Sequence, residues 1–140
     1  MLTIYRFVTY LVLVLSPIII LFRIFRDKEH PKRFLEKYSL NKIKKKTGKT
    51  VWFHGSSVGE ILSSIPVIEK LEKKKDIKQI LLTSNTLSSS KIIKKFKLNK
   101  TVHQFFPLDI NFITLKFLNY WKPNLVIFLE SEIWPNMLIN

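Results

Sequence analysis

The spacing of hydrophobic positions changes along this chain and divides it into three parts. Residues 1–26 form a nearly continuous apolar stretch, residues 27–50 are polar and charged, and residues 51–140 alternate short apolar runs with longer amphipathic segments. Short apolar runs are typical of buried strands, and apolar residues three or four positions apart are typical of helices. The sequence therefore predicts an apolar N-terminal helix, a basic linker or loop, and a domain of alternating strands and helices.

The third part predicts four strands and three helices in strict alternation. Strands are expected at residues 51–54, 77–84, 101–107 and 124–130, and helices at residues 58–74, 86–97 and 109–121. Pro66 is expected to bend the first helix because a mid-helix proline loses a backbone hydrogen bond. Asp109 is expected to be the N-cap of the third helix. The fourth strand, NLVIFLE, has the continuous apolar sequence of a strand that is covered on both faces.

Strict alternation of strands and helices favours a parallel sheet with right-handed crossovers. We therefore predict an α/β domain with a Rossmann-like, doubly wound parallel sheet. If the strand order is 3-2-1-4, it reverses between the first and fourth strands, and ligands bind outside the carboxyl ends of the strands at such a point. The first strand is followed by HGSSVGE (54–60) and the fourth by ESEIWPN (130–136). We predict that these two strings converge at one crevice.

The uncharged part of the N-terminal stretch lies between Arg6 and Arg23 and contains sixteen residues, FVTYLVLVLSPIIILF. A helix of this length spans about 24 Å, which is shorter than the roughly 30 Å hydrocarbon core of a bilayer. A span therefore needs the flanking apolar residues, with the arginines extended toward the interface. Pro17 weakens a straight span, and a helix that lies in the interface is the alternative. We expect residues 1–26 to anchor the chain to a membrane.

The segment after this stretch is strongly basic. From Arg23 to Lys49 there are eleven basic and three acidic residues. The positive-inside rule places this segment, and the domain that follows it, on the cytoplasmic side. No A-x-A-like cleavage site follows the apolar run, which argues against a cleaved signal peptide.

The composition of the chain excludes one class of partner and several kinds of chemistry. The chain carries a formal net charge of +14, but only four of its basic residues are arginines, and it has no cysteine. Nucleic-acid readers rely on arginine forks and on mixed aromatic and basic motifs, so we expect no nucleic-acid partner. The absence of cysteine excludes disulfide, zinc–thiolate and cysteine-nucleophile chemistry.

The first string, HGSSVGE, has a structural and a functional interpretation. Ser57-x-x-Glu60 is a capping box, in which the glutamate satisfies the backbone N–H of the serine. The glycines suit a turn and close packing of helix on sheet. The string matches neither the phosphate-binding P-loop nor the dinucleotide-binding glycine pattern. His54, at a strand end, is more often a hydrogen-bonded structural histidine than a base.

The second string places Glu130 and Glu132 at the end of an apolar strand. A carboxylate there must be desolvated or paired, which shifts its pKa and suits acid–base chemistry. Pro135 fits the first turn of a further helix. His103, inside a strand, is interpreted as structural, and no set of metal ligands is apparent.

At these two strings the sequence resembles a known family. HGSSVGE and ESEIWPN are similar to signatures of the bacterial 3-deoxy-D-manno-octulosonic acid (Kdo) transferases of lipopolysaccharide assembly. The apolar anchor with its basic flank, IPVIEKL after the first string, and FPLD at residues 106–109 support the resemblance. It runs in matching order over nearly the whole chain.

The resemblance implies the acceptor-binding N-terminal half of a two-domain GT-B glycosyltransferase. Such an enzyme transfers Kdo from the donor CMP-Kdo to a lipid A precursor (lipid IVA) at the cytoplasmic face of the inner membrane, with no cofactor or metal. Nothing in the sequence resembles the second domain, which holds most of the CMP-Kdo site. A domain that ended at Asn140 would leave the fourth strand half covered, so we expect part of a longer protein. Whether the 140 residues transfer Kdo alone is left open.

The resemblance also assigns roles to residues of the two strings. Glu60 corresponds to the general base, which the helix N-terminus should keep ionised. The second essential acid falls within ESE, where we favour Glu130 over Glu132 because it ends the strand directly. The remaining residues are expected to bind the acceptor or to support the site, and they are His54, Gly55, Ser56, Ser57, Gly59, Glu132, Trp134 and Asn136.

Two other functions remain as alternatives. One is a GT-B transferase that uses the same membrane anchor with a different donor. The other is a membrane-tethered, non-catalytic α/β module that binds anionic lipid through its lysines. Membrane lipids are an expected partner in all three cases.

Overall fold

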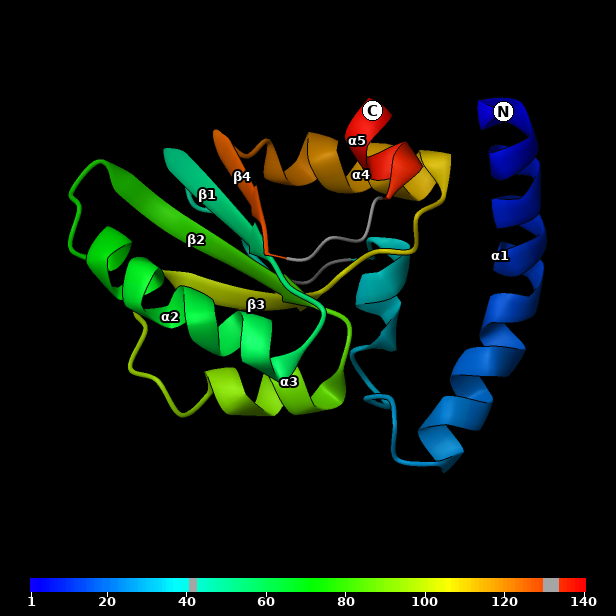
Figure 1. The fold of residues 1–140 in the computed structure, drawn as a ribbon, viewed down its shortest axis with the longest axis horizontal. Helices are drawn as coiled ribbons and strands as arrows, with labels where there is room; N and C mark the ends of the chain where they lie inside the picture. Colours follow the sequence, from blue (N-terminus) through cyan, green and yellow to red (C-terminus); the bar gives the residue numbers. More distant parts are fainter. Residues whose placement is uncertain (41–42, 130–133) are drawn as a thin grey trace.

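The computed structural model describes residues 1–40, 43–129 and 134–140. The elements follow one another as helix α1 (Leu2–Phe25), 3-10 helix η1 (Phe34–Tyr38), strand β1 (Lys49–His54), helix α2 (Val58–Glu72), strand β2 (Ile77–Ser84), helix α3 (Leu87–Ile93), strand β3 (Thr101–Phe105), helix α4 (Asn111–Trp121), strand β4 (Leu125–Phe128) and helix α5 (Pro135–Ile139). Figure 1 shows the sheet between two layers of helices, with α2 and α3 on one side and α4 on the other.

The strand order is β3-β2-β1-β4, the order that was assumed in locating the crevice, and all the pairings are parallel as predicted. Alternate residues of a strand face opposite sides of the sheet. Val51 and Phe53 accordingly pack with Ile61 and Ile68 of α2, whereas Trp52 packs with Phe117 on the α4 side. The doubly wound α/β fold predicted from the sequence is therefore confirmed.

Strand β4 occupies one edge of the described sheet, and Leu125 and Val126 are 52% and 37% exposed. The described residues leave this strand half covered, so the expectation that both its faces are covered stays a prediction.

Helix α4 begins later than predicted, and Asp109 is not its N-cap. The N-cap is Ile110, which has no side-chain capping bond. Asp109 instead accepts hydrogen bonds from the backbone N–H groups of Asn136 and Met137, at 3.0 and 2.8 Å, in the first turn of α5. The cap therefore belongs to a helix that begins 26 residues further along the chain.

The first part of the segment expected to be a basic linker or loop contains the 3-10 helix η1. Glu36, in η1, is buried, and its carboxylate binds Arg33 at 2.7 Å and accepts a hydrogen bond from the backbone N–H of Phe105 at 2.8 Å. Buried carboxylates need such partners to remain charged. This segment is therefore fastened to the end of β3.

Arg33 also organises the environment of His103, in β3. The Arg33 guanidinium can only donate, so its 2.9 Å contact assigns Nδ1 of His103 as the acceptor. The ring proton then lies on Nε2, which donates to Ser84 Oγ at 2.8 Å. Burial, together with the positive charges of Arg33 and Lys94, lowers the pKa of His103 to about 3. The histidine is a neutral structural residue, as the sequence indicated.

Candidate active site

The first string and Leu129, the residue before the second string, lie side by side at the carboxyl ends of β1 and β4, where the strand order reverses. The backbone N–H of Leu129, just after β4, donates to the carbonyl of His54 at 2.8 Å. The backbone N–H of Gly55 donates to the carbonyl of Thr83, at the end of β2. Glu130 and Glu132 lie outside the described residues, so their predicted roles stay predictions. Leu129 lies next to the first string, and Trp134 is linked to it only through Phe106, so the convergence of the two strings stays a prediction.

Glu60 lies in the first turn of α2 and closes a complete capping box. Ser57 Oγ accepts from the backbone N–H of Glu60 at 3.2 Å, and Glu60 Oε2 accepts from the backbone N–H groups of Ser57 at 3.2 Å and Ser56 at 2.7 Å. The carboxylate is partly exposed. It is thus a solvent-accessible proton acceptor whose position is fixed by the backbone, which is what a general base requires.

Gly55 allows the turn to pack closely. A Cβ atom at this position would lie 3.2 Å from Glu60 Cβ, 3.3 Å from Ile61 Cδ1 and 3.3 Å from Leu129 Cδ1. Gly59, by contrast, is exposed, and a Cβ there would have only Ser57 Oγ nearby, at 4.0 Å. Gly55 therefore fixes the distance between the Glu60 turn and the residue before Glu130, whereas Gly59 has no such packing role.

His54, at the end of β1, is fully buried. Its Nδ1 lies 2.9 Å from Thr83 Oγ1, a hydroxyl that also accepts from Trp52 Nε1 at 2.8 Å. The imidazole stacks on Phe106 with a centroid distance of 3.8 Å, and Phe106 in turn contacts Trp134 at 5.4 Å. This aromatic series joins the first string to the end of the second.

Asn136 has a supporting position as well. Its side chain is buried, with Nδ2 donating to the carbonyl of Asp109 at 2.7 Å and Oδ1 accepting from Arg6 Nε at 3.2 Å. Pro135 occupies the first turn of α5, as the sequence predicted. Asn136 therefore holds α5 against both the loop before α4 and the N-terminal helix.

Sequence reasoning missed three residues that contribute to this region. Asn85 donates from Nδ2 to Ser56 Oγ at 2.9 Å, which ties the Glu60 turn to the end of β2. Asp109 and Arg6 hold Asn136, as described above. Asn85 directly follows a predicted strand. The carboxyl ends of parallel strands lie at one edge of the sheet, so the sequence could have indicated that Asn85 lies near the site. The sequence carried no signal for the partners of Asn136.

The region contains no recognisable metal centre among the residues that the structure describes. Within residues 1–40, 43–129 and 134–140, no three His, Asp or Glu side chains come together as metal ligands do. The expectation that the chemistry needs neither a metal nor a cofactor stays a prediction.

Comparison with known proteins gives a consistent result. Residues 31–140 match the family model described as 3-deoxy-D-manno-octulosonic-acid transferase (kdotransferase). The chain is 37% identical over 135 residues to a protein of Arabidopsis thaliana named "Probable 3-deoxy-D-manno-octulosonic acid transferase, mitochondrial", covering 96% of this chain and 30% of that one. It is 34% identical over 138 residues to the 3-deoxy-D-manno-octulosonic acid transferase of Rickettsia bellii, covering 99% and 33%. The protein of that name from Haemophilus influenzae is 28% identical over 136 residues, covering 94% and 32%.

These matches extend over nearly the whole chain, and they include both strings. The chain spans about a third of the length of these curated relatives. The chain therefore belongs to the 3-deoxy-D-manno-octulosonic-acid transferase family.

Proposed function

We propose that this chain is the acceptor-binding part of a glycosyltransferase that transfers Kdo from CMP-Kdo to a lipid A precursor. The donor site is expected in the portion of the relatives that lies beyond this chain. The observation that carries the proposal is the Glu60 carboxylate, held by two backbone N–H groups at the carboxyl edge of a parallel sheet. Ligands of such sheets bind at this edge.

In this mechanism Glu60 is the general base. A hydroxyl of the acceptor sugar attacks the anomeric carbon of CMP-Kdo, and the new carbon–oxygen bond forms as the bond to the CMP phosphate breaks. The hydroxyl proton passes to Glu60, and CMP leaves with the electron pair. Because both backbone hydrogen bonds are accepted by Oε2, Oε1 is the proposed proton acceptor.

The second acidic residue of the mechanism remains a proposal on sequence grounds. Glu130 is favoured over Glu132, and both follow β4 directly in sequence. Leu129 and Trp134, on either side of them, contact the first string through His54 and Phe106 respectively. This placement supports a second carboxylate near Glu60.

The arrangement of the molecule supports a lipid acceptor. The carboxyl ends of the strands point toward the side on which α1 lies (Figure 1). Helix α1 is long and apolar enough to cross a membrane, by length and composition. We therefore propose that the Glu60 turn faces the cytoplasmic side of the inner membrane and meets the sugar of a membrane-embedded acceptor there.

Transfer of Kdo from CMP-Kdo to a lipid A precursor tests this proposal. One arm contains the chain in membranes, and the other adds the remaining part of the Rickettsia bellii relative as a separate polypeptide. We expect transfer in the second arm, and we expect it to be lost with Glu60→Gln and retained with Glu69→Gln on the exposed side of α2. A folded, membrane-bound chain without transfer in either arm would contradict the proposal and favour a non-catalytic lipid-binding module. Transfer from another sugar nucleotide alone would favour a different donor.

A further inference from the structure

The face of α1 that packs on the domain is its more polar face. The less exposed residues of this helix recur every three or four positions and are Leu2, Tyr5, Arg6, Thr9, Leu13, Ser16, Ile20, Arg23 and Ile24. Tyr5 donates to Asp109 at 2.7 Å, and Arg6 donates to Asn136 at 3.2 Å. Further along, Ser16 bonds Tyr38 at 2.7 Å and Arg23 pairs with Glu29 at 3.3 Å. The domain and the segment after α1 therefore provide partners for polar groups of α1 along most of its length.

The opposite face of α1 is apolar and exposed. It consists of Ile4, Phe7, Val8, Leu11, Val12, Val14, Leu15, Ile18, Ile19, Leu21, Phe22 and Phe25, each between 45% and 86% exposed. A surface helix of a water-soluble protein has the reverse arrangement, with its apolar stripe toward the core. A continuous exposed apolar surface of this size marks an interaction with lipid or protein.

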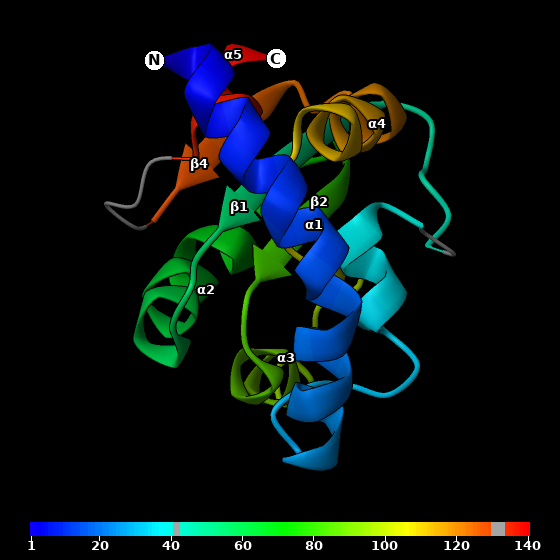
Figure 2. The same ribbon diagram turned by 90° about the vertical axis from the view of Figure 1, so that its right-hand side faces the viewer.

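The contacts between α1 and the rest of the chain extend over too much of the helix for it to cross a bilayer. From Tyr5 to Arg23 the helix extends about 27 Å, close to the roughly 30 Å of a hydrocarbon core. Figure 2 shows α1 crossing one face of the domain over this length. A spanning α1 that kept these contacts would carry Glu29, Asp109 and the charged surface around them into the hydrocarbon, where charged groups are very costly.

We propose that α1 lies in the plane of the membrane, with its exposed apolar face inserted in one leaflet, and that it does not span the bilayer. Interfacial helices usually turn a polar face toward water. Here the domain covers the polar face of α1. The rest of the helix surface therefore needs no polar residues to face water and is almost wholly apolar. The proposal goes beyond the transferase activity, since it concerns how the chain is held and oriented at the lipid surface.

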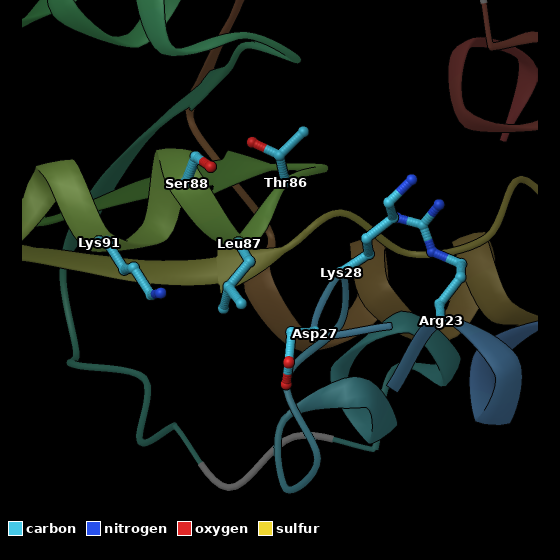
Figure 3. Close-up of a pocket in the computed structure, with 7 residues that line it drawn as sticks. All are labelled: Arg23, Asp27, Lys28, Thr86, Leu87, Ser88 and Lys91. Carbon is cyan, nitrogen blue, oxygen red and sulfur yellow. The ribbon is translucent and has the colours of Figure 1, made fainter. Parts of the chain in front are cut away.

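Two features of the domain fit a lipid leaflet as the partner of this face. Phe112 of α4, 49% exposed, stacks on Tyr10 of α1, which continues the apolar surface from α1 onto the domain. At the other end of α1, Arg23, Lys28 and Lys91 line a cavity of about 280 Å³ between α1 and α3, together with one carboxylate, Asp27 (Figure 3). Positive side chains beside an inserted apolar face are attracted to anionic headgroups.

Cysteine labelling distinguishes an in-plane helix from a spanning one, because the chain has no cysteine of its own. One variant carries two cysteines, one in a short Gly–Ser extension before Met1 and one in place of Lys70, an exposed residue of α2. It is reconstituted into sealed vesicles of phosphatidylethanolamine and phosphatidylglycerol and treated with a membrane-impermeant maleimide. Mass spectrometry then counts the labels on each molecule.

An in-plane α1 places both cysteines on the same side, so each molecule gains two labels or none. A spanning α1 places them on opposite sides, so each molecule gains one label, and that result would overturn the proposal. In detergent-permeabilised vesicles every molecule should gain two labels, which confirms that both sites react. The labelling experiment does not depend on sugar transfer. It can therefore contradict the in-plane helix without contradicting the proposed activity, and the reverse also holds.

Flotation with the same vesicles tests whether lipid is the partner. We expect the chain to float, and Val14→Glu, on the exposed apolar face, to reduce the floating fraction at least tenfold. The matched control, Val67→Glu on the exposed side of α2, should float as the unaltered chain does. A chain that stays in solution as a lipid-free dimer would show that a second copy covers this face, and would overturn the proposal.

Discussion

The carboxylate of Asp109 accepts a hydrogen bond from the backbone N–H of Asn136 at 3.0 Å, although 27 residues separate the two. The same carboxylate accepts from the backbone N–H of Met137 and from the hydroxyl of Tyr5. One buried side chain thus joins the loop before α4, the first turn of α5 and the N-terminal helix. This joint fixes the first turn of α5, whose residues Pro135 and Asn136 end the string that contains Glu130 and Glu132.

Replacing Asp109 with alanine should destabilise the chain by about 2–3 kcal/mol, because it leaves buried donors without an acceptor. The measurement is urea unfolding in detergent micelles, followed by circular dichroism. Asp76→Ala is the control, since Asp76 is 58% exposed and faces Lys49 at 3.5 Å, and its loss should change stability by less than about 0.5 kcal/mol. Equal effects of the two substitutions would contradict the capping role.

Glu60→Gln should lower kcat for Kdo transfer by about 10²–10⁴-fold and leave KM for the acceptor nearly unchanged. Glutamine retains an oxygen for the capping box but does not accept a proton at neutral pH, so the fold should be preserved. Steady-state kinetics in the assay with the supplemented C-terminal part measure the change. A variant with normal kcat would show that Glu60 only caps the helix.

The two glycines of the first string should respond differently to alanine. Gly55→Ala places a methyl group against Glu60, Ile61 and Leu129, so we expect a loss of about 1–2 kcal/mol and reduced transfer. Gly59→Ala meets open space on a helix and should be neutral or stabilise by up to about 1 kcal/mol. Thermal unfolding of the two variants compares them directly. A destabilising Gly59→Ala, or a neutral Gly55→Ala, would contradict the packing described.

His103 should remain neutral well below its ordinary pKa. The unfolded chain, with a histidine pKa of about 6.5, binds more protons than the folded chain between that pH and the folded pKa of about 3. The contribution of His103 to the free energy of unfolding is therefore fully present above pH 6.5, and it is lost as the pH falls toward 3. Nitrogen NMR at pH 5 should show the neutral Nε2–H tautomer in the folded chain and the imidazolium in urea. An imidazolium in the folded chain at pH 5 would contradict the assignment.

Local patterns in the sequence predicted most of the fold. Strand β2 was expected at residues 77–84, where it lies, because its apolar run is bounded on both sides by polar residues. The Ser57–Glu60 capping box followed from spacing alone, since both its bonds are local. Alternation of elements then predicted the parallel sheet, and the two strings were expected at one edge of it on the condition that the strand order was 3-2-1-4.

Interactions between distant segments were not predictable in the same way. Asp109 has the composition of an N-cap for the helix beside it, but its carboxylate binds Asn136 and Met137 instead. The basic segment after α1 appeared to be a linker because no sequence rule indicates that Glu36 reaches the end of β3. In both cases the partner of the charged residue is distant in the sequence and is brought close only by the tertiary fold.

The contact between Arg6 and Asn136 also implies an order of assembly. These residues are 130 positions apart, so the partners that dock the first helix are synthesised long after the helix itself. During this interval only the C-terminal half of α1 has partners for its polar stripe, Tyr38 and Glu29. Tyr5 and Arg6 gain theirs only when Asp109 and Asn136 are in place, which makes docking of the first turns of α1 a late step in biogenesis.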